Sequence, residues 1–145
     1  LKDKSDGKYT FTMPAGKVEV KATFMEDNSM LNFFYDVPNG AYFYEAVKWA
    51  VENGITTGTA DGLFAPDATC TRAQGMTFLF RASKASADGA PAFSDVAADA
   101  YYAEAVKWAT DNGITNGTTS STFSPGSGCT RAQIVTFLYR LYGSK

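Results

Sequence analysis

The sequence predicts a mainly α fold, in which tandem helix–loop–helix repeats pack as a pseudo-symmetric helical bundle after a short N-terminal β-hairpin. Three observations predict this fold: an internal repeat, an apolar stripe of helical spacing in each copy, and a helix-capping motif in each copy. Segment 34–82 aligns without a gap with segment 93–141. About 28 of roughly 49 aligned positions are identical, as in repeat architectures. A repeat that cannot bury its own apolar face must pack against a copy.

The first helix of each repeat is expected over about 41–53, and over the matching residues of the second copy. Its apolar residues follow a helical period and form one stripe. They are Tyr42, Ala46, Trp49 and Ala50, and then Tyr101, Ala105, Trp108 and Ala109. Gly54 and Gly113 follow as left-handed C-terminal caps, with Ile55 and Ile114 placed for the hydrophobic contact that accompanies such a cap.

The second helix of each repeat is expected to begin at Thr71 or Thr130 and to end near Arg81 or Arg140. It follows a loop rich in Gly and Thr. The Thr–Arg–Ala–Gln sequence at its start is a capping box, in which the Thr side chain and the Gln side chain each bond the other residue's backbone N–H. Its apolar positions are Met76, Leu79 and Phe80 in the first copy, and Val135, Leu138 and Tyr139 in the second.

The chain divides into five segments. Residues 1–27 alternate apolar and polar side chains on both sides of a turn at 14–17, which predicts a β-hairpin. Residues 28–33 read as a linker, 34–82 as the first repeat, 83–92 as a second linker rich in Ala, Ser and Gly, and 93–142 as the second repeat. Because the sequence has neither an initiator Met nor a signal peptide, we expect it to be an internal or C-terminal piece of a longer protein.

Composition narrows the classes of function. A net charge of −2 argues against a nucleic-acid partner and an anionic membrane surface, and no apolar run suggests membrane insertion. The chain contains no histidine, which excludes His-dependent triads, His general bases and His-ligated zinc. The carboxylates form no recognisable glycosidase pair. We therefore expect no catalytic residues, no cofactor and no metal.

Arg72 and Arg131 are the residues that helix capping leaves unexplained. A cation in the first turn opposes the helix macrodipole, at a cost of a few tenths of a kcal/mol. An anion bound there would reverse the sign, because it could accept free backbone N–H groups and pair with the guanidinium. Each repeat thus offers a candidate anion site. The alternative is that each Arg pairs with a local carboxylate, Asp36 or Asp95, since most exposed ion pairs are incidental.

Taken together, the motifs resemble the S-layer homology (SLH) family. Phe-x-Asp-Val, Ala-Val-x-Trp-Ala, Gly-Ile-Thr-x-Gly, Phe-x-Pro and Thr-Arg-Ala-Gln occur in this order in both copies, from about Phe34 to Leu141. The resemblance implies a bacterial cell-surface module, usually of three repeats in a pseudo-threefold bundle. It implies binding of secondary cell-wall polysaccharide, often pyruvylated, in grooves between repeats. It also implies Arg72 and Arg131 as groove residues, with Asp36 and Asp95 as weaker candidates.

Two departures from the family pattern bear on function. Gln74 and Gln133 stand where the family usually has Glu. Gln still completes the capping box, and the loss of two carboxylates makes the groove more positive. Only two repeats are found, so a third lies outside this sequence, comes from another chain, or is absent. Residues 1–27 resemble the closing strands of β-repeats in bacterial surface proteins, which implies the remnant of an upstream β-domain.

Cysteine and tryptophan pairs recur at matching positions. Cys70 and Cys129 read as small buried hydrophobic residues, with a disulfide as the alternative if their Cα atoms come within about 7 Å. Trp49 and Trp108 lie on the apolar stripe and are expected in the core, although an edge could reach a groove and stack on a sugar.

The sequence thus predicts a non-catalytic, extracellular anchoring module of the bacterial cell wall. By the family resemblance, it would bind anionic secondary cell-wall polysaccharide, which is often pyruvylated, through Arg at helix N-termini in grooves between repeats. The candidate ligand-binding residues are Arg72, Arg131, Asp36, Asp95, Trp49, Trp108, Gln74 and Gln133. The alternative is a structural or assembly module, in which a homo-oligomer supplies the missing third repeat.

Overall fold

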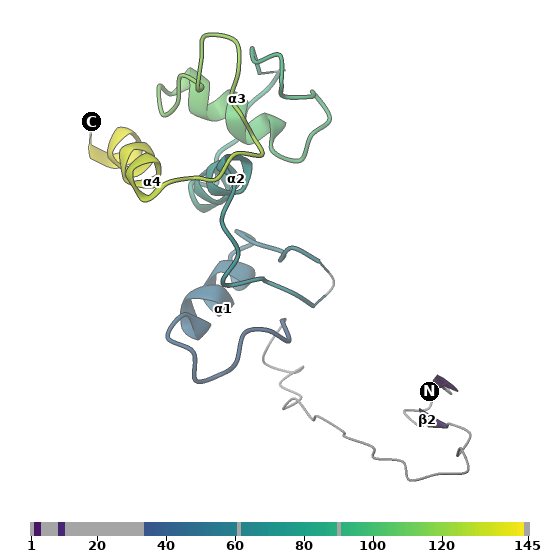
Figure 1. Cartoon of the computed structure of the whole chain (residues 1–145). Coiled ribbons are helices and arrows are strands. Elements are labelled where there is room, and N and C mark those ends of the chain that lie inside the picture. Colours follow the sequence, from purple (N-terminus) through teal and green to yellow (C-terminus); the bar gives the residue numbers. More distant parts are fainter. Residues whose placement is uncertain (1, 4–8, 11–33, 61, 90, 144–145) are drawn as a thin grey trace.

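The computed structural model describes residues 2–3, 9–10, 34–60, 62–89 and 91–143. Within them the chain is mainly α, as predicted (Figure 1). The helices are α1 (Tyr44–Glu52), α2 (Arg72–Ala82), α3 (Ala103–Asp111) and α4 (Arg131–Leu138), followed by a π-helical turn, η1 (Tyr139–Gly143). None of these helices is long and apolar enough to cross a membrane.

The structure does not support the predicted N-terminal hairpin. The described strands are β1 (Lys2–Asp3) and β2 (Tyr9–Thr10), which pair with each other in antiparallel register. The predicted turn at 14–17 and the second predicted strand lie outside the described residues. Among the described residues, the strand at Tyr9 pairs with residues that precede it.

The first helix of each repeat begins later than predicted and ends as predicted. Two turns, closed by bonds from Ala41 N–H to the Pro38 carbonyl and from Tyr44 N–H to the Ala41 carbonyl, delay the start of α1. Tyr42 consequently precedes the helix and is 98% exposed, so it is not part of a core stripe. Gly54 has φ +68° and the Ile55 N–H bonds the Ala50 carbonyl at 2.8 Å, which confirms the left-handed cap.

The capping boxes predicted at the second helices are both present. The Thr71 hydroxyl accepts from the backbone N–H of Gln74 at 3.2 Å, and the side-chain Oε1 of Gln74 accepts from the backbone N–H of Thr71 at 2.9 Å. The same reciprocal pair occurs between Thr130 and Gln133. Each box satisfies two polar groups that would otherwise lack partners at the helix start, which is why α2 and α4 begin where the motif places them.

The main core joins the second helix of one repeat to the next repeat. The apolar face of α2 packs against α3 (Figure 1), so that the prediction of packing between copies is confirmed. Met76 of α2 is fully buried together with Val106, Ile114 and Phe123 of the second repeat. A second, smaller core lies within the first half of repeat 1, around Val37. The packing unit is therefore α2 with α3, and it spans the boundary between the sequence repeats.

Equivalent helices consequently have different surroundings. Trp108 on α3 is 7% exposed and meets Phe80 of α2 edge to face, with ring centroids 5.6 Å apart. Trp49 occupies the same place on α1 but is 56% exposed, so its predicted core position is wrong. The apolar stripe predicted on α4 is also exposed, with Val135 at 63%. Within the described residues, α2 and α3 cover each other's apolar faces, whereas the corresponding faces of α4 and α1 are not covered by another helix.

Candidate functional site

The two repeats meet where their second helices begin. Thr71 and Gly128 form an antiparallel bridge, flanked by a bond from Arg72 N–H to the Ser127 carbonyl at 2.9 Å. The next N–H of α2, that of Ala73, bonds the Pro125 carbonyl at 3.1 Å. Together with the capping Thr71, these carbonyls satisfy the first three N–H groups of α2. The start of α2 is therefore closed by the second repeat and offers no free N–H to an anion.

The side chain of Arg72 is part of this junction. It is only 3% exposed, its Nε donates to the Phe123 carbonyl at 2.9 Å, and its guanidinium lies over the Phe123 ring at 4.7 Å and the Phe137 ring at 5.6 Å. Its Nη2 is buried without a hydrogen-bond partner among the described residues. Burial lowers the pKa of the guanidinium, and the nearby Cys129 and Asp95 act against that shift. The predicted ligand role of Arg72 stays a prediction, and its present contacts are with the protein.

Arg131 holds the same place in the second repeat but is exposed. The first turn of α4 is satisfied at Gln133 by the capping Thr130. No partner is described for the N–H groups of Arg131 and Ala132 within the ranges that the structure covers. The start of α4 is therefore open where the start of α2 is closed, and it has the free cation and free N–H groups that the predicted anion site requires.

Asp36 and Asp95 organise the Phe-x-Pro loops. Asp95 accepts from the N–H groups of Phe123 at 2.8 Å and Ser124 at 2.7 Å, and Asp36 accepts from the matching pair in repeat 1 at 2.9 and 2.6 Å. Neither forms an ion pair with Arg72 or Arg131 among the described residues, where the recorded ion pair joins Lys107 to Asp111. The described structure therefore shows no close Arg–Asp ion pair at either place, although the charges of Arg72 and Asp95 still attract each other at longer range.

The pKa of Asp95 reflects these contacts. Partial burial raises the pKa of the carboxyl, but the N–H groups of Phe123, Ser124 and Asp95 itself, with the charge of Arg72, outweigh that effect. The net result is a pKa below the ordinary value of an aspartate. Asp95 is thus held ionised by the loop that it supports.

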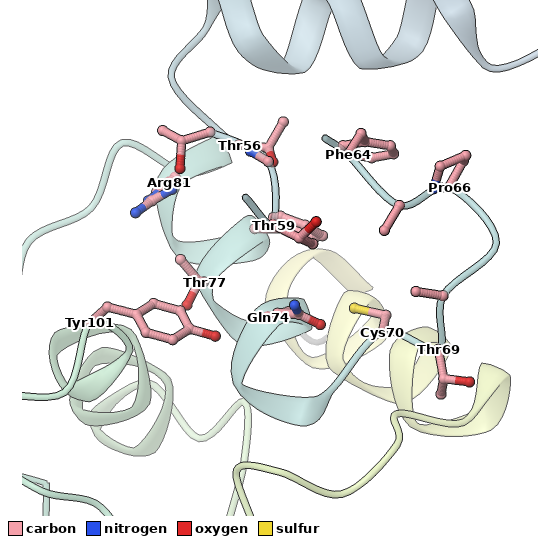
Figure 2. A pocket seen from close by; sticks show the side chains of 15 residues that line it. Thr56, Thr59, Phe64, Pro66, Thr69, Cys70, Gln74, Thr77, Arg81 and Tyr101 are labelled. Atoms are coloured by element: carbon pink, nitrogen blue, oxygen red, sulfur yellow. The ribbon is translucent and has the colours of Figure 1, made fainter. Parts of the chain in front are cut away.

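A cavity of about 510 Å³ opens beside the junction and was not found from the sequence (Figure 2). Repeat 1 supplies its Thr-rich loop, its Phe-x-Pro loop and one face of α2, and repeat 2 supplies Tyr101. Figure 2 shows the Tyr101 ring reaching towards Gln74, with Phe64 and Pro66 on another wall. Of the eight predicted ligand residues, Gln74 is the one that lines this cavity. Trp108 is buried in the core and Trp49 lies on the open face of α1.

The chemistry of the cavity is that of a polar site with an aromatic wall. Thr56, Thr59 and Thr77 line it, each with its hydroxyl bonded to a backbone group of repeat 1, and Arg81 is the cation among its lining residues. Like any tyrosine, Tyr101 has a protonated hydroxyl at neutral pH that can donate a hydrogen bond, and burial raises its pKa further. Sequence reasoning missed Tyr101 because it was assigned to a core stripe, whereas the turn before α3 leaves it 63% exposed.

Comparison with known proteins identifies the repeats. A family model described as "S-layer homology domain" matches residues 33–74 and 92–135. A protein of Lysinibacillus sphaericus named "Surface-layer 125 kDa protein" is 34% identical over 110 residues, which cover 76% of this chain and 9% of that protein. The chain thus spans a small part of the relative's length.

These matches confirm the resemblance that the motifs predicted. S-layer homology domains generally anchor surface proteins to the cell wall and are not enzymes, which confirms the expectation of a non-catalytic chain. Similarity to a surface-layer protein implies a place at the cell surface. The two matched segments together cover more than half of the sequence, and the chain therefore belongs to the S-layer homology family.

Proposed function

We propose that this chain anchors its parent protein to the bacterial cell wall by binding an anionic secondary cell-wall polysaccharide in the cavity between its repeats. The observation that carries the proposal is the composition of the cavity. It combines a protonated Tyr101, several Thr hydroxyls and one cation, Arg81. Sugars are bound by such a combination, because aromatic walls stack on their apolar faces and polar groups bond their hydroxyls.

Arg81 is the cavity residue suited to an anionic substituent such as a pyruvate ketal. It is half-buried on α2, and one bond, from Nη1 to the Ile55 carbonyl at 3.3 Å, holds its guanidinium in place. The remaining N–H groups of a guanidinium can form a bidentate pair with a carboxylate. We assign the primary anion contact to Arg81, and a secondary one to Arg131 at the open start of α4. Arg72 then serves to hold the two repeats together.

Gln74 supports the choice of an anion. Its carbonyl oxygen is used by the capping box, which leaves its NH₂ group as the part of the side chain available to the cavity. A Glu in this place would present a carboxylate to the cavity that Arg81 also lines, and would weaken binding of an anionic ligand. The Gln therefore completes the capping box and keeps the cavity free of negative charge.

Binding to wall preparations tests the proposed function. The purified chain should be retained by cell-wall sacculi and released when secondary polysaccharide is extracted from them. Soluble extracted polysaccharide should compete for retention, and neutral polysaccharide of similar size should not. Equal retention before and after extraction would show that the chain recognises peptidoglycan itself, and the proposal would then be wrong.

A second candidate function is assembly, and the exposed faces of α1 and α4 favour it. The face of α4 around Val135 corresponds to the face of α2 that covers α3, and the face of α1 around Trp49 corresponds to the covered face of α3. The first and the last α-helix of the described repeats, α1 and α4, therefore carry faces that correspond to the two sides of the α2–α3 interface. Arg131 of one copy would meet Phe64 of the next as Arg72 meets Phe123.

Complementary variants test assembly. Because the contact joins two different faces, it is heterologous, and head-to-tail association would follow. The wild-type chain should sediment as a concentration-dependent oligomer. Val135→Glu and Trp49→Glu should each be monomeric alone, but their mixture should form a heterodimer through the one intact pair of faces. A wild-type chain that stays monomeric at all concentrations would exclude self-assembly and leave wall binding as the function.

A further inference from the structure

The two cysteines lie opposite each other across the junction of the repeats. The Cys129 N–H bonds the Cys70 carbonyl at 2.8 Å, next to the Thr71–Gly128 bridge. Directly opposed residues with such a bond have Cα atoms about 5.5 Å apart in an antiparallel pair, and their side chains emerge on the same face. That separation lies within the range that a disulfide spans.

The sulfur atoms flank a single gap on α2. A Cβ atom placed on Gly75 would lie 3.9 Å from the Cys70 sulfur and 3.8 Å from the Cys129 sulfur. The matching residue of repeat 2 is Ile134, whose Cδ1 would lie 3.2 Å from the same point. Both sulfur atoms therefore lie within van der Waals reach of the same point on α2, and residue 75 places no side chain between them.

We propose that Cys70 and Cys129 are a disulfide site that cross-links repeat 1 to repeat 2. Both cysteines are free thiols here, and the Cys70 thiol donates a weak bond to the Thr71 carbonyl at 3.5 Å. The backbone register is already in place, so rotation about the Cα–Cβ bonds together with a small approach of the two segments would bring the sulfurs together. A surface protein works outside the cell, away from the reducing cytosol, and a disulfide persists in that environment.

The reaction is thiol–disulfide exchange with a small disulfide oxidant. One cysteine thiolate attacks a sulfur of the oxidant, which forms a mixed disulfide and releases one thiol. The other cysteine then attacks the mixed disulfide at the protein sulfur, which forms the Cys70–Cys129 bond and releases the second thiol. Two electrons pass from the cysteines to the oxidant, and each cysteine gives up its proton to solvent or to a departing thiolate.

The position of Cys70 decides where an oxidant can enter, and the pKa values of the two thiols decide how the rate of oxidation depends on pH. Cys70 lines the cavity, so a small oxidant can reach it from there. Burial raises the pKa of both thiols, the neighbouring Cys129 raises that of Cys70 further, and Arg72 lowers that of Cys129. Oxidation therefore accelerates as pH rises and the thiolate fraction grows.

Oxidation of the complete chain under native conditions tests the proposal. After equilibration with excess oxidised glutathione, the chain should lose both titratable thiols and two hydrogens in mass, while remaining monomeric on a non-reducing gel. Peptide mapping should recover one cross-linked pair that contains Cys70 and Cys129. The midpoint of thermal unfolding should rise by on the order of 10 °C and return on reduction, because the bond closes a loop of one whole repeat.

Matched variants separate this bond from other oxidation products. Cys129→Ser should stop at a mixed disulfide on Cys70, and the variant with both cysteines changed to Val should unfold at one temperature irrespective of the oxidant. The proposal is wrong if the wild-type chain keeps two free thiols at equilibrium. It is equally wrong if the wild-type chain accumulates two mixed disulfides, or if the cross-linked peptides come from a dimer.

Discussion

The side chain of Arg72 makes two contacts with Phe123, one with its backbone carbonyl and one with its aromatic ring. The Nε of Arg72 donates to the Phe123 carbonyl at 2.9 Å, and the guanidinium lies over the ring of the same residue at 4.7 Å. The two residues lie in different repeats. A residue that family resemblance assigned to the ligand thus serves, in the described structure, as a clamp between the repeats.

Replacing this clamp should destabilise the chain, whereas the same change in repeat 2 should not. Arg72→Ala removes the bond to the buried Phe123 carbonyl and the cation–π contact, and should lower the free energy of unfolding by about 2 kcal/mol. Arg131→Ala changes an exposed side chain and should stay within about 0.5 kcal/mol. Urea titration of each variant and of the wild-type chain measures these changes in the free energy of unfolding. Equal losses in the two variants would mean that the burial of Arg72 contributes nothing to stability.

Asp95 should make stability depend on pH in the acid range. Its folded pKa lies below the ordinary aspartate value of about 3.9. The carboxylate therefore contributes stability above that pH, and the contribution is lost as pH falls through the folded pKa. Because Asp95 is exposed and its charge is screened by solvent, Asp95→Asn should lower the free energy of unfolding by only about 0.5–1 kcal/mol at pH 7, and this deficit should shrink as pH falls below about 3.9.

The measurement for Asp95 is the urea midpoint of both proteins between neutral and strongly acid pH. Asp99→Asn, at an exposed residue before α3, is the matched control and should follow the wild-type chain throughout. A deficit of Asp95→Asn that stays constant down to acid pH would mean that the charge of the carboxylate is irrelevant to the loop.

Ala65 and Ser124 hold left-handed backbone conformations with φ +58° in the two Phe-x-Pro loops. A residue with a Cβ pays roughly 1–2 kcal/mol there, and glycine does not. Ala65→Gly should therefore raise the free energy of unfolding by roughly 0.5 kcal/mol, after the larger unfolded-state entropy of glycine is deducted. The same substitution inside a helix, Ala46→Gly on α1, should lower it by about 1 kcal/mol. If both substitutions changed the free energy of unfolding in the same direction, the backbone of Ala65 would not be strained.

The charge of residue 74 should change the affinity for an anionic ligand without changing the fold. Gln74→Glu keeps an acceptor for the Thr71 N–H, so circular dichroism and the unfolding midpoint should change little. The new carboxylate faces the cavity and should weaken binding of anionic wall polysaccharide by roughly tenfold, at about 1.4 kcal/mol. Gln133→Glu, the same change in the other repeat, lies outside the cavity and should bind like the wild-type chain. Binding is measured by titration calorimetry.

Local chemistry explains what could be predicted from the sequence. The capping boxes at Thr71 and Thr130 and the cap at Gly54 depend on residues within one turn, and both were predicted correctly. The pairing of α2 with a copy also followed, since an amphipathic helix alone cannot bury its apolar face. The caps are properties of a short segment, and the pairing follows from the apolar face of the helix together with the presence of a copy.

The remaining features depend on neighbours that a repeat pattern does not distinguish. Trp49 and Trp108 stand in nearly identical segments, yet one is exposed and the other buried, because only α3 has α2 beside it. Arg72 and Arg131 differ for the same reason. The cavity could not be predicted because it is assembled from both repeats, with Tyr101 in a turn that the helical period had placed in a core stripe.

The measurement that tests the central claim most directly compares Arg81→Ala with Arg140→Ala in binding to purified anionic wall polysaccharide. The two arginines hold equivalent places and bond equivalent carbonyls, those of Ile55 at 3.3 Å and Ile114 at 3.1 Å, but only Arg81 lines the described cavity. We expect Arg81→Ala to lose at least tenfold in affinity while Arg140→Ala binds like the wild-type chain. Equal affinities of all three proteins would contradict binding of the anion in this cavity.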